Sequence, residues 1–400
     1  MSEKEEIVIV GAGIIGVCTA YYLLNHPKFD PKKHHITIIE AVRAAGGASG
    51  KAGGLLALWA FPSQIVPMSF ALHEKLADKY NGAVEWGYRR VSTVSVEGNL
   101  MKTGPAPLGR KVAGRAPTHS SEKGPDVDLP EDLDWIRPEV IDSWSHLGGT
   151  DSTAQVHPFK FTTFILKKVL ESGHATLVLG SVKRVNTRLN DDDEEEAISV
   201  TYTASPGDER TIAASKVVLA VGPWTSKLLP TCPISGLRAH SITIVPTKPT
   251  TAYGIFTELR VSRNRYVSPE IYARKDEIYV CGEGDSLPVP ENTDAVEVER
   301  ERCDELFKWA GDLSHQLKNG KVLKRQACYL PVVDVPSCTG PLIGETTTLN
   351  LFLASGHSCW GINNAPGTGL LIAELLLDGE ATSADISQFD PKLYFDSSEL

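Results

Sequence analysis

The hydrophobic positions near the start of the chain fall into short apolar runs separated by a stretch with helical spacing. Residues 7–10 (IVIV) and 34–40 (HHITIIE) are the apolar runs, and residues 13–24 between them carry apolar side chains on one helical face. Short apolar runs bounded by turn residues predict buried strands. The order strand, helix, strand predicts a β-α-β unit and therefore a parallel sheet.

The same reading extends along the rest of the chain. Helices are predicted over residues 68–80, 159–173 and 291–313, and strands over residues 93–98, 175–189, 197–204, 211–224, 240–248 and 266–284, with a further strand near Cys328. Residues 102–134 are rich in Pro, Gly and charge and show little periodicity, which predicts a long exposed loop. The acidic run 191–196 is expected at a hairpin tip, because a block of like charge favours a solvated turn.

Length and charge narrow the class of protein. A chain of 400 residues exceeds one ordinary core and predicts two domains. The net charge is −10 and no basic stripe is present, so nucleic acid is not an expected partner. No apolar run reaches about 18 residues, so no membrane span is predicted.

Cysteine and histidine positions bear on the compartment and on metals. Seven cysteines are dispersed without a C-x-x-C pair, and the first residues, MSEKEE, do not resemble a targeting segment. A dispersed, odd set of cysteines fits a reducing compartment, so a cytoplasmic location is expected. The histidines and cysteines show no zinc-ligand spacing, so no metal site is predicted.

A glycine-rich turn follows the first strand directly. Residues 11–16 (GAGIIG) match the spacing G-x-G-x-x-G. In this motif the first Gly makes a tight turn, the second lets a pyrophosphate approach the backbone, and the third lets helix and strand pack closely. The start of the helix offers free N–H groups to phosphates. Glu40, at the end of the second strand, can accept the ribose hydroxyls of an adenosine, so a dinucleotide site is predicted.

A second glycine-rich turn lies at the opposite end of the chain, within residues 351–379, where an apolar strand leads to a long apolar helix expected to begin near Ala365. NAD and FAD share the first motif. Residues 43–58, however, are rich in Gly and Ser and can press backbone amides onto a longer cofactor, whereas a plain NAD dehydrogenase would usually enter another β-α-β unit. The second turn would also have no role in such a dehydrogenase, so FAD is the favoured cofactor.

Five stretches in the right order resemble the glycine/D-amino-acid oxidase superfamily of FAD-dependent amine oxidoreductases. They are residues 7–16 with Glu40, residues 48–54, residues 155–163, residues 216–229 and residues 356–379. The resemblance covers nearly the whole chain and points to a fungal branch of this family.

The resemblance implies an α/β chain, α+β overall, with two domains. A Rossmann-like FAD-binding domain with a mixed sheet is expected from residues 1–75, 150–230 and 326–400. A substrate domain with an antiparallel sheet is expected from residues 76–149 and 231–325.

The resemblance also implies oxidation of a C–N bond in a small amine or amino acid. A hydride would pass to flavin N5, the imine would hydrolyse, and O₂ would reoxidise the flavin to give H₂O₂. Two alternatives stay open: a dehydrogenase with an acceptor other than oxygen, and a weakly active flavoprotein that serves as a binding or regulatory module.

Contacts with FAD are implied for both glycine turns, for the segment after Glu40, for Val182 near the adenine and for the strand before Trp224. The residues are Val10, Gly11, Gly13, Ile14, Ile15, Gly16, Glu40, Ala41, Ser49, Gly50, Lys51, Ala52, Gly53, Gly54, Val182, Ala220, Gly222, Trp224, Cys328, Gly356, His357, Trp360, Gly361, Ile362 and Asn363. Cys328 resembles the cysteine that bonds covalently to FAD in some relatives, but Leu330 and Pro331 depart from that pattern, so a buried free cysteine is the alternative.

Catalytic roles are implied for residues expected near the flavin ring or in the roof of the substrate cavity. They are Lys51, Tyr272, Arg274, His357 and Trp360. Lys51 is a candidate for binding the flavin, a substrate carboxylate or O₂, with a solvent-exposed lysine as the alternative. Arg274 is a candidate for a bidentate carboxylate clamp, with a hairpin-end arginine as the alternative. His157 and His240 are interpreted as structural residues.

Overall fold

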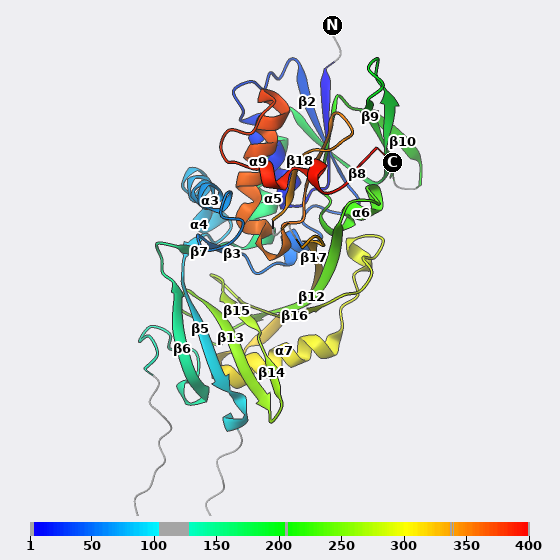
Figure 1. Ribbon diagram of the computed structural model, residues 1–400. Helices are drawn as coiled ribbons and strands as arrows, with labels where there is room; N and C mark the ends of the chain where they lie inside the picture. The colour runs from blue at the N-terminus through cyan, green and yellow to red at the C-terminus, as the bar shows by residue number, and fades with distance from the viewer. Residues whose placement is uncertain (1–3, 104–127, 205–206, 337, 339, 399–400) are drawn as a thin grey trace, which may run out of the picture.

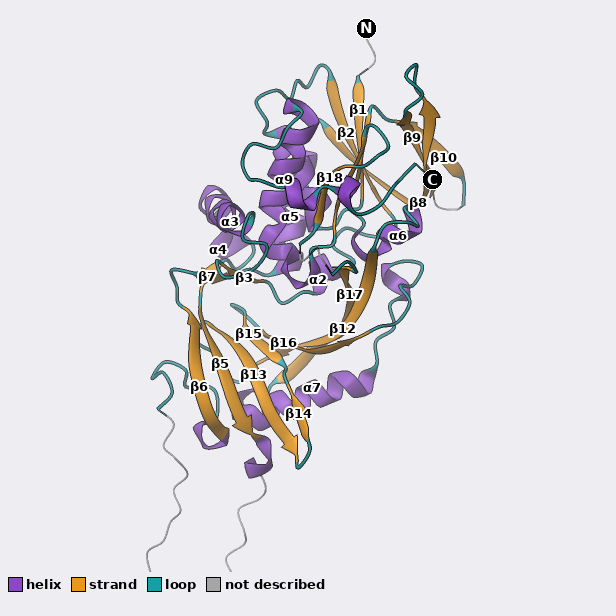
Figure 2. Ribbon diagram, viewed as in Figure 1, coloured by secondary structure: helices purple, strands orange, loops and turns teal. Residues whose placement is uncertain are grey.

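The computed structural model describes residues 4–103, 128–204, 207–336, 338 and 340–398. Two large sheets dominate these residues, one in the upper part of the molecule and one in the lower part (Figures 1 and 2). Elements from both ends of the described chain, β1 and α9, lie in the upper part (Figure 1).

The first sheet is mixed. Its strands, in spatial order, are β10 (Glu209–Ala213), β9 (Glu195–Ala204), β8 (Ala175–Leu189), β2 (His34–Glu40), β1 (Glu5–Val10), β11 (Lys216–Leu219), β19 (Leu351–Ser355) and β18 (Leu342–Glu345). The strands from β8 to β19 run parallel, and the strands outside them are antiparallel. Strands from both ends of the chain therefore share one sheet, which agrees with the predicted mixed sheet.

Helices cover one face of this sheet. They are α1 (Ile14–Leu24), α3 (Val66–Tyr80), α5 (Pro158–Glu171) and α9 (Gly361–Asp378), with the short helices α2 (Ala48–Lys51), α4 (Gly82–Glu85) and α6 (Thr225–Leu228) nearby. Ile7 and Ile9 of β1 pack toward the long helices, whereas Val8 and Val10 pack into a separate core on the other face. Burial on both faces explains why β1 has a continuous apolar run without alternation.

The second sheet is antiparallel apart from one pair. Its path runs β17 (Lys321–Val333), β12 (Ile234–Val245), β16 (Ile278–Asp285), β15 (Glu270–Ala273), β13 (Tyr253–Ser262), β5 (Ser92–Asn99) and β6 (Ile141–Gly148), and β14 (Arg265–Val267) pairs with β13. Only β5 and β13 run parallel among these pairs. Helices α7 (Arg300–Leu313) and α8 (His315–Lys318) pack beneath this sheet and form a core with it (Figure 1).

Shorter elements complete the described chain. The strands β3 (Leu55–Ala57), β7 (Thr153–Gln155) and β4 (Arg89–Arg90) form a small third sheet. The 3-10 helices are η1 (Leu100–Thr103), η2 (Pro138–Val140), η3 (Gly222–Trp224), η4 (Thr293–Ala295), η5 (Ser358–Trp360), η6 (Ser387–Phe389) and η7 (Pro391–Leu393). No helix in the described part of the chain combines the length and apolar character needed to cross a bilayer.

Several predicted elements differ from the structure, and the strand expected over residues 266–284 is divided among β14, β15 and β16. The helix expected over residues 291–313 begins only at Arg300, and the strand expected over residues 211–224 is divided between β10 and β11. In the loop expected over residues 102–134, residues 104–127 lie outside the described residues. The last part of that loop is not fully exposed, because Leu133 is buried in the core of the second sheet.

Candidate functional site

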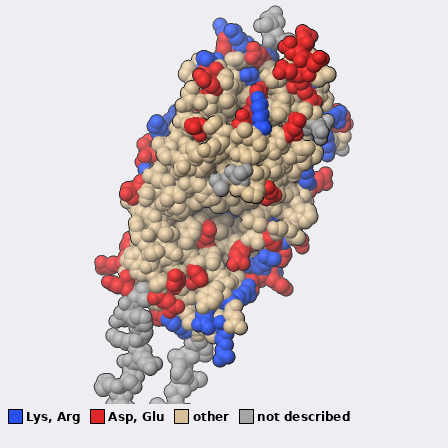
Figure 3. All heavy atoms as spheres, in the orientation of Figure 1, with Lys and Arg blue, Asp and Glu red and all other residues tan. Residues whose placement is uncertain are grey.

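A cavity of about 540 Å³ lies between the two large sheets. Its first-sheet side includes the carboxyl ends of β1, β2 and β11, part of β8 and the turn before α9, and its other side includes parts of β12, β13, β15, β16 and β17. The face drawn in Figure 3 is hollowed at mid-height, and few charged side chains surround the hollow. A junction of this kind is a common place for a ligand site.

The first glycine turn is packed too closely for side chains. Gly11 has a φ of +103°, and a Cβ there would lie 2.6 Å from the carbonyl oxygen of Ala220, directly after β11. A Cβ at Gly16 would lie 2.1 Å from the carbonyl oxygen of Gly11. The first and third glycines therefore serve the tight turn and the close helix packing expected of the motif.

The two polar side chains beside this turn hold its backbone. Ser49 of α2 accepts a hydrogen bond from the amide of Ile14 at 2.8 Å, at the start of α1. The buried carboxylate of Glu40 accepts bonds from the amides of Ala12 at 2.9 Å and Val42 at 3.1 Å. Both side chains also line the cavity, so a ligand there would meet a fixed backbone.

The second glycine turn leads into helix α9 four residues earlier than expected. The helix starts at Gly361 rather than near Ala365, directly after the 3-10 turn Ser358–Trp360. Trp360, Gly361 and Ile362 line the cavity. The N-terminus of α9 therefore opens onto the cavity and presents the positive end of an 18-residue helix.

His357 is held in this turn as a neutral side chain. Its Nε2 lies 2.9 Å from the hydroxyl of Thr368 on α9, and the residue is only 4% exposed. Burial lowers the pKa of His357 to about 3. A neutral imidazole with one nitrogen already engaged is better suited to position the turn than to exchange protons at neutral pH.

The structure brings most of the predicted cofactor residues to this one cavity. Those that line it are Val10, Gly11, Gly13, Ile14, Ile15, Glu40, Ala41, Ser49, Ala52, Gly53, Gly54, Val182, Ala220, Gly222, Trp224, Cys328, His357, Trp360, Gly361 and Ile362. Those that do not line it are Gly16, Gly50, Lys51, Gly356 and Asn363. The last of these uses its amide oxygen to accept from the Ala57 amide at 3.0 Å, which holds β3 against α9.

Lys51 does not line the cavity. Its ammonium donates to the carbonyl oxygen of Ala327 on β17 at 3.0 Å, and burial lowers its pKa. The predicted roles in binding a carboxylate or O₂ within the cavity do not fit this position. The lysine instead joins α2 to the second sheet.

Arg274 is also outside the cavity. Its guanidinium donates to the carbonyl oxygens of Ala52 and of Gly53, the latter at 3.1 Å, and forms an ion pair with Glu277 at 2.6 Å. These partners use the donors that a substrate carboxylate would need, so the predicted carboxylate clamp does not fit. The arginine lies at the end of β15, where the chain turns away from the cavity.

Tyr272 does line the cavity, and it brings residues that the sequence analysis missed. Its hydroxyl donates to the carboxylate of Glu270, two residues earlier on the same face of β15. Phe256 of β13 and Cys281 of β16 are the direct cross-strand neighbours of Glu270, and both line the cavity with it. The period-two spacing of Glu270 and Tyr272 is the signal that could have placed this carboxylate beside the predicted tyrosine.

Cys328 lines the cavity, and its thiol is buried. Burial raises its pKa to about 11, and the ammonium of Lys51 offsets this only in part. All seven cysteines of the chain are free.

A connecting segment, residues 286–299, which we call the strap, forms part of the cavity wall. Glu291, Asn292 and Thr293 line the cavity, and the carbonyl oxygen of Pro290 accepts from Trp224 Nε1 at 2.7 Å. Asp294 pairs with Arg43, which follows β2. The strap thus reaches from the second sheet back to the first.

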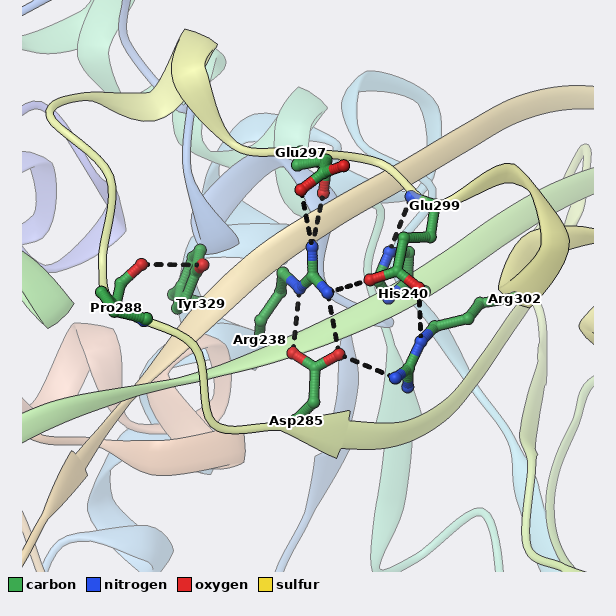
Figure 4. Close-up of polar contacts among 8 residues, drawn as sticks. All are labelled: Arg238, His240, Asp285, Pro288, Glu297, Glu299, Arg302 and Tyr329. Carbon is green, nitrogen blue, oxygen red and sulfur yellow. Dashed lines mark hydrogen bonds and ion pairs between the residues drawn. The ribbon is translucent and has the colours of Figure 1, made fainter.

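The base of the strap is fixed by a group of charged side chains (Figure 4). Arg238 of β12 is only 1% exposed and makes a bidentate pair with Asp285, with both N–O distances at 2.9 Å. The same guanidinium also pairs with Glu299, and Arg302 bridges Asp285 and Glu299 from α7.

The two histidines interpreted as structural lie outside the cavity. His240 accepts a hydrogen bond from the amide of Glu299 at 3.0 Å, at the base of the strap (Figure 4). His157 lines a separate cavity of about 160 Å³ and lies 3.5 Å from the Glu277 carboxylate. Burial lowers the pKa of His157 to about 4.

The chemistry of the large cavity fits a long dinucleotide such as FAD. Its first-sheet wall is mostly glycine and other small residues, so backbone can approach a ligand closely. At Gly222, whose φ is +55°, an added Cβ would meet no atom within 4 Å, so the backbone there borders the open space of the cavity. The wall offers helix N-termini from both glycine turns at separate places, as a ligand with two electron-rich parts requires. Among the described residues, no cluster of three or more His, Cys, Asp and Glu side chains is arranged to hold a metal ion.

Comparison with known families agrees with this fit. The family described as FAD dependent oxidoreductase (DAO) matches residues 6–375. The chain is 45% identical to "Putative oxidoreductase TDA3" of Saccharomyces cerevisiae over 504 aligned positions, which cover 99% of this chain and 96% of that protein. It is 37% identical to "Putative oxidoreductase C1F5.03c" of Schizosaccharomyces pombe, with 98% and 99% covered.

Solved structures share the fold at low sequence identity. Glycine oxidase from Geobacillus kaustophilus superposes with a TM-score of 0.69 at 18% identity, covering 97% of this chain and 99% of that one. L-proline dehydrogenase from P. horikoshii superposes with a TM-score of 0.68 at 18% identity, covering 98% of each chain.

Proposed function

The chain belongs to the DAO family of FAD-dependent oxidoreductases, and from this premise we propose that it oxidises a C–N bond of a small amine or amino acid. The observation that carries the proposal is the composition of the cavity. One wall is a glycine-rich surface suited to a dinucleotide, and the opposite wall is a sheet with aromatic and carboxylate side chains suited to a small organic molecule. The two walls would hold a cofactor and a substrate face to face.

FAD in this cavity would supply a two-electron acceptor for a hydride leaving the carbon next to nitrogen. We propose that the first glycine turn binds the pyrophosphate, that Glu40 faces a ribose and that Val182 lies near the adenine. The N-terminus of α9 would favour negative charge at the far end of the cofactor. The residues around Phe256 and Trp360 would orient the substrate and exclude water.

The experiment is anaerobic reduction of the purified protein by a panel of amines and amino acids. We expect a visible flavin band near about 450 nm that is bleached by at least one member of the panel. Admission of air should restore the band and release H₂O₂ if oxygen is the acceptor. A protein that shows no flavin band after incubation with FAD, or that no C–N compound reduces, would contradict the proposal. Reduction without reoxidation by air would favour a dehydrogenase.

We further propose that FAD is held without a covalent bond to Cys328. A buried thiol whose pKa is raised to about 11 is almost wholly protonated at neutral pH and is a weak nucleophile. After acid precipitation the yellow colour should therefore appear in the supernatant, for the wild type and for Cys328→Ser alike. Colour that stays with the wild-type pellet and leaves the pellet of the variant would contradict this.

We also propose a cytoplasmic location. The seven free cysteines, six of them not exposed, support a reducing environment. Fluorescence microscopy of the tagged full-length chain tests this directly.

A further inference from the structure

The part of the cavity that faces β13, β15 and β16 contains one charged side chain, Glu270, among the described residues. Apart from His357, which is neutral, the other acidic and basic residues that line the cavity are Glu40, Lys183, Lys227 and Glu291. These four belong to the first sheet, to the segments that follow its strands and to the strap. A substrate held against the second sheet would therefore meet a carboxylate and no cationic side chain.

Glu270 has no cationic partner of its own. One carboxylate oxygen accepts from the hydroxyl of Tyr272 and lies 3.9 Å from the thiol of Cys281. Among the described residues its other oxygen has no hydrogen-bond partner, and no Lys, Arg or His forms an ion pair with it. Burial raises the pKa of Glu270. Glu270 is half-buried. A partly desolvated carboxylate without a counter-ion is costly, and a cation in the cavity would reduce that cost.

Aromatic rings surround this carboxylate. Phe256 is its cross-strand neighbour, and the ring of Phe256 lies 5.9 Å from that of Tyr272. Trp360 reaches the same region from the second glycine turn, through Trp59, whose ring lies 5.8 Å from Phe256 and 5.5 Å from Trp360. The faces of such rings attract cations, most strongly those of tryptophan.

Among the described residues, no cationic side chain that could bind an amino-acid carboxylate lines the cavity near Glu270. Arg274 is engaged by Glu277 and by the backbone of α2 and the glycines after it, and Lys51 is engaged by Ala327. Neither side chain lines the cavity. A substrate carboxylate would be placed near Glu270 without compensation, which like-charge repulsion disfavours.

We infer that the substrate is an aliphatic amine that is cationic and carries no carboxylate, with its nitrogen recognised by Glu270 and by the rings of Phe256 and Trp360. This inference rests on the proposed function and narrows its substrate class. Glu270 would draw the ammonium to the sheet side of the cavity and fix which carbon faces the cofactor. The aromatic rings would accept alkyl groups on nitrogen, as they accept methylated ammonium groups in general.

The test uses three small probes that the protein cannot oxidise at nitrogen. Tetramethylammonium is a permanent cation, tert-butanol is a neutral molecule of similar shape, and trimethylglycine combines the cation with a carboxylate. A quaternary nitrogen has no lone pair to assist hydride loss, so binding is measured without turnover. Isothermal titration calorimetry on the FAD-loaded full-length protein gives the three dissociation constants.

We expect tetramethylammonium to bind at least about tenfold more tightly than either other probe. Glu270→Gln should weaken tetramethylammonium binding by about tenfold and leave tert-butanol binding unchanged. Glu258→Gln removes the same charge from an exposed position on β13 and should change neither. Flavin absorbance and melting temperature of each variant report whether it is folded.

The dissociation constants of the three probes for the wild-type protein can overturn the inference even if the variants do not fold. Equal binding of tetramethylammonium and tert-butanol, tighter binding of trimethylglycine, no measurable binding of the cation, or unchanged cation binding in a folded Glu270→Gln protein would each do so. If an amino acid reduces the flavin while cation selectivity is absent, the proposed function stands and this inference fails. If the cation binds selectively but neither an amine nor an amino acid reduces the flavin, the proposed function fails, whereas the cation site at Glu270 stands.

Discussion

Gly16 shows at the scale of one residue why the first glycine turn tolerates no substitution. Its missing side chain makes room for the carbonyl oxygen of Gly11, which a Cβ would approach to 2.1 Å. Both groups belong to backbone in a packed core, so neither can move aside cheaply. The position is therefore required by packing, whether or not a ligand is bound.

We predict that Gly16→Ala lowers the free energy of unfolding by roughly 3 kcal/mol or more, at the upper end of the cost of overpacking. Gly361→Ala is the matched control, because its φ is helical and the nearest atom to an added Cβ is 3.5 Å away. That variant should change stability by less than about 1 kcal/mol. Urea unfolding without added FAD measures both. Equal effects of the two substitutions would contradict this account.

His73 gives a prediction about pH. It is buried on α3 with Nε2 2.8 Å from the carbonyl oxygen of Ile362, and burial lowers its pKa from 6.5 to about 4. Between these values the unfolded chain binds the proton and the folded chain does not. The stability contributed by neutral His73 is therefore complete above pH 6.5 and is lost as the pH falls toward 4. His357 and His157 shift in the same direction and should add to the effect.

We expect His73→Gln, which keeps a hydrogen-bond donor, to be less sensitive to acid than the wild type. At pH 5 the ionisation of this one histidine costs about 2 kcal/mol of stability relative to pH 7.5. The measurement is the difference in unfolding free energy between the two pH values, for each protein. If that difference is the same in the variant, His73 does not titrate as the structure implies.

At the scale of elements, the strap is positioned by contacts at its base and at its tip. Arg238 holds its base through Asp285 and Glu299, and Trp224 holds its tip through Pro290. The strap is a long connection that passes over a cavity wall, so its backbone is fixed by distant side chains and not by regular secondary structure.

We predict that Arg238→Ala destabilises the protein by roughly 2–3 kcal/mol. This is less than the 3–5 kcal/mol typical of a broken, fully buried pair, because the acidic partners reach solvent. Arg184→Ala is the control, since Arg184 pairs with Glu209 at an exposed position and should cost less than about 1 kcal/mol. Thermal unfolding compares the two. If Arg184→Ala destabilises the protein as much as Arg238→Ala, burial does not increase the contribution of the Arg238 ion pairs to stability.

Elements with strong local signals could be predicted from the sequence, and those set by distant contacts could not. The apolar runs of β1 and β2 and the glycine spacing of the first turn contain their own signal, and their predicted positions agree with the structure. Residues 291–299 were expected to be helical as the first part of one amphipathic segment over residues 291–313. In the structure Asn292 caps a single 3-10 turn there, and Glu299 is extended as it binds Arg238 and His240.

The site residues also divide into those with a local sequence signal and those whose role depends on distant contacts. Gly11 was found because the glycine spacing follows a motif, and Glu40 because it is the acidic residue that ends the next strand. Arg274 and Lys51 were expected in the cavity because their types suit a carboxylate, but a strand end and a short helix turn them toward backbone carbonyl groups instead. Glu270 was missed because its meaning depends on Phe256 and Cys281 across the sheet, which are distant in sequence.

At the scale of the whole molecule, the cavity joins the two sheets, so a ligand that fills it should stabilise the entire fold. FAD at 100 times its dissociation constant would add about 2.7 kcal/mol to the free energy of unfolding. We expect a concentration-dependent rise in melting temperature of FAD-depleted protein on addition of FAD. NAD at the same concentration should give a smaller rise, since it lacks the part that would reach the second glycine turn. A larger effect of NAD would contradict the assignment of the cofactor.

The adjacency of β1, β11 and β19 in one sheet has a consequence for protein synthesis. β1 leaves the ribosome some 340 residues before β19 and the turn that precedes α9. At 5–20 residues per second this delay lasts roughly 20–70 s. During that time the apolar strand at the start of the chain lacks the last neighbours of its sheet. A nascent chain cut short before residue 351 could not complete the site, so cofactor capture requires translation to have passed β19 and the turn after it.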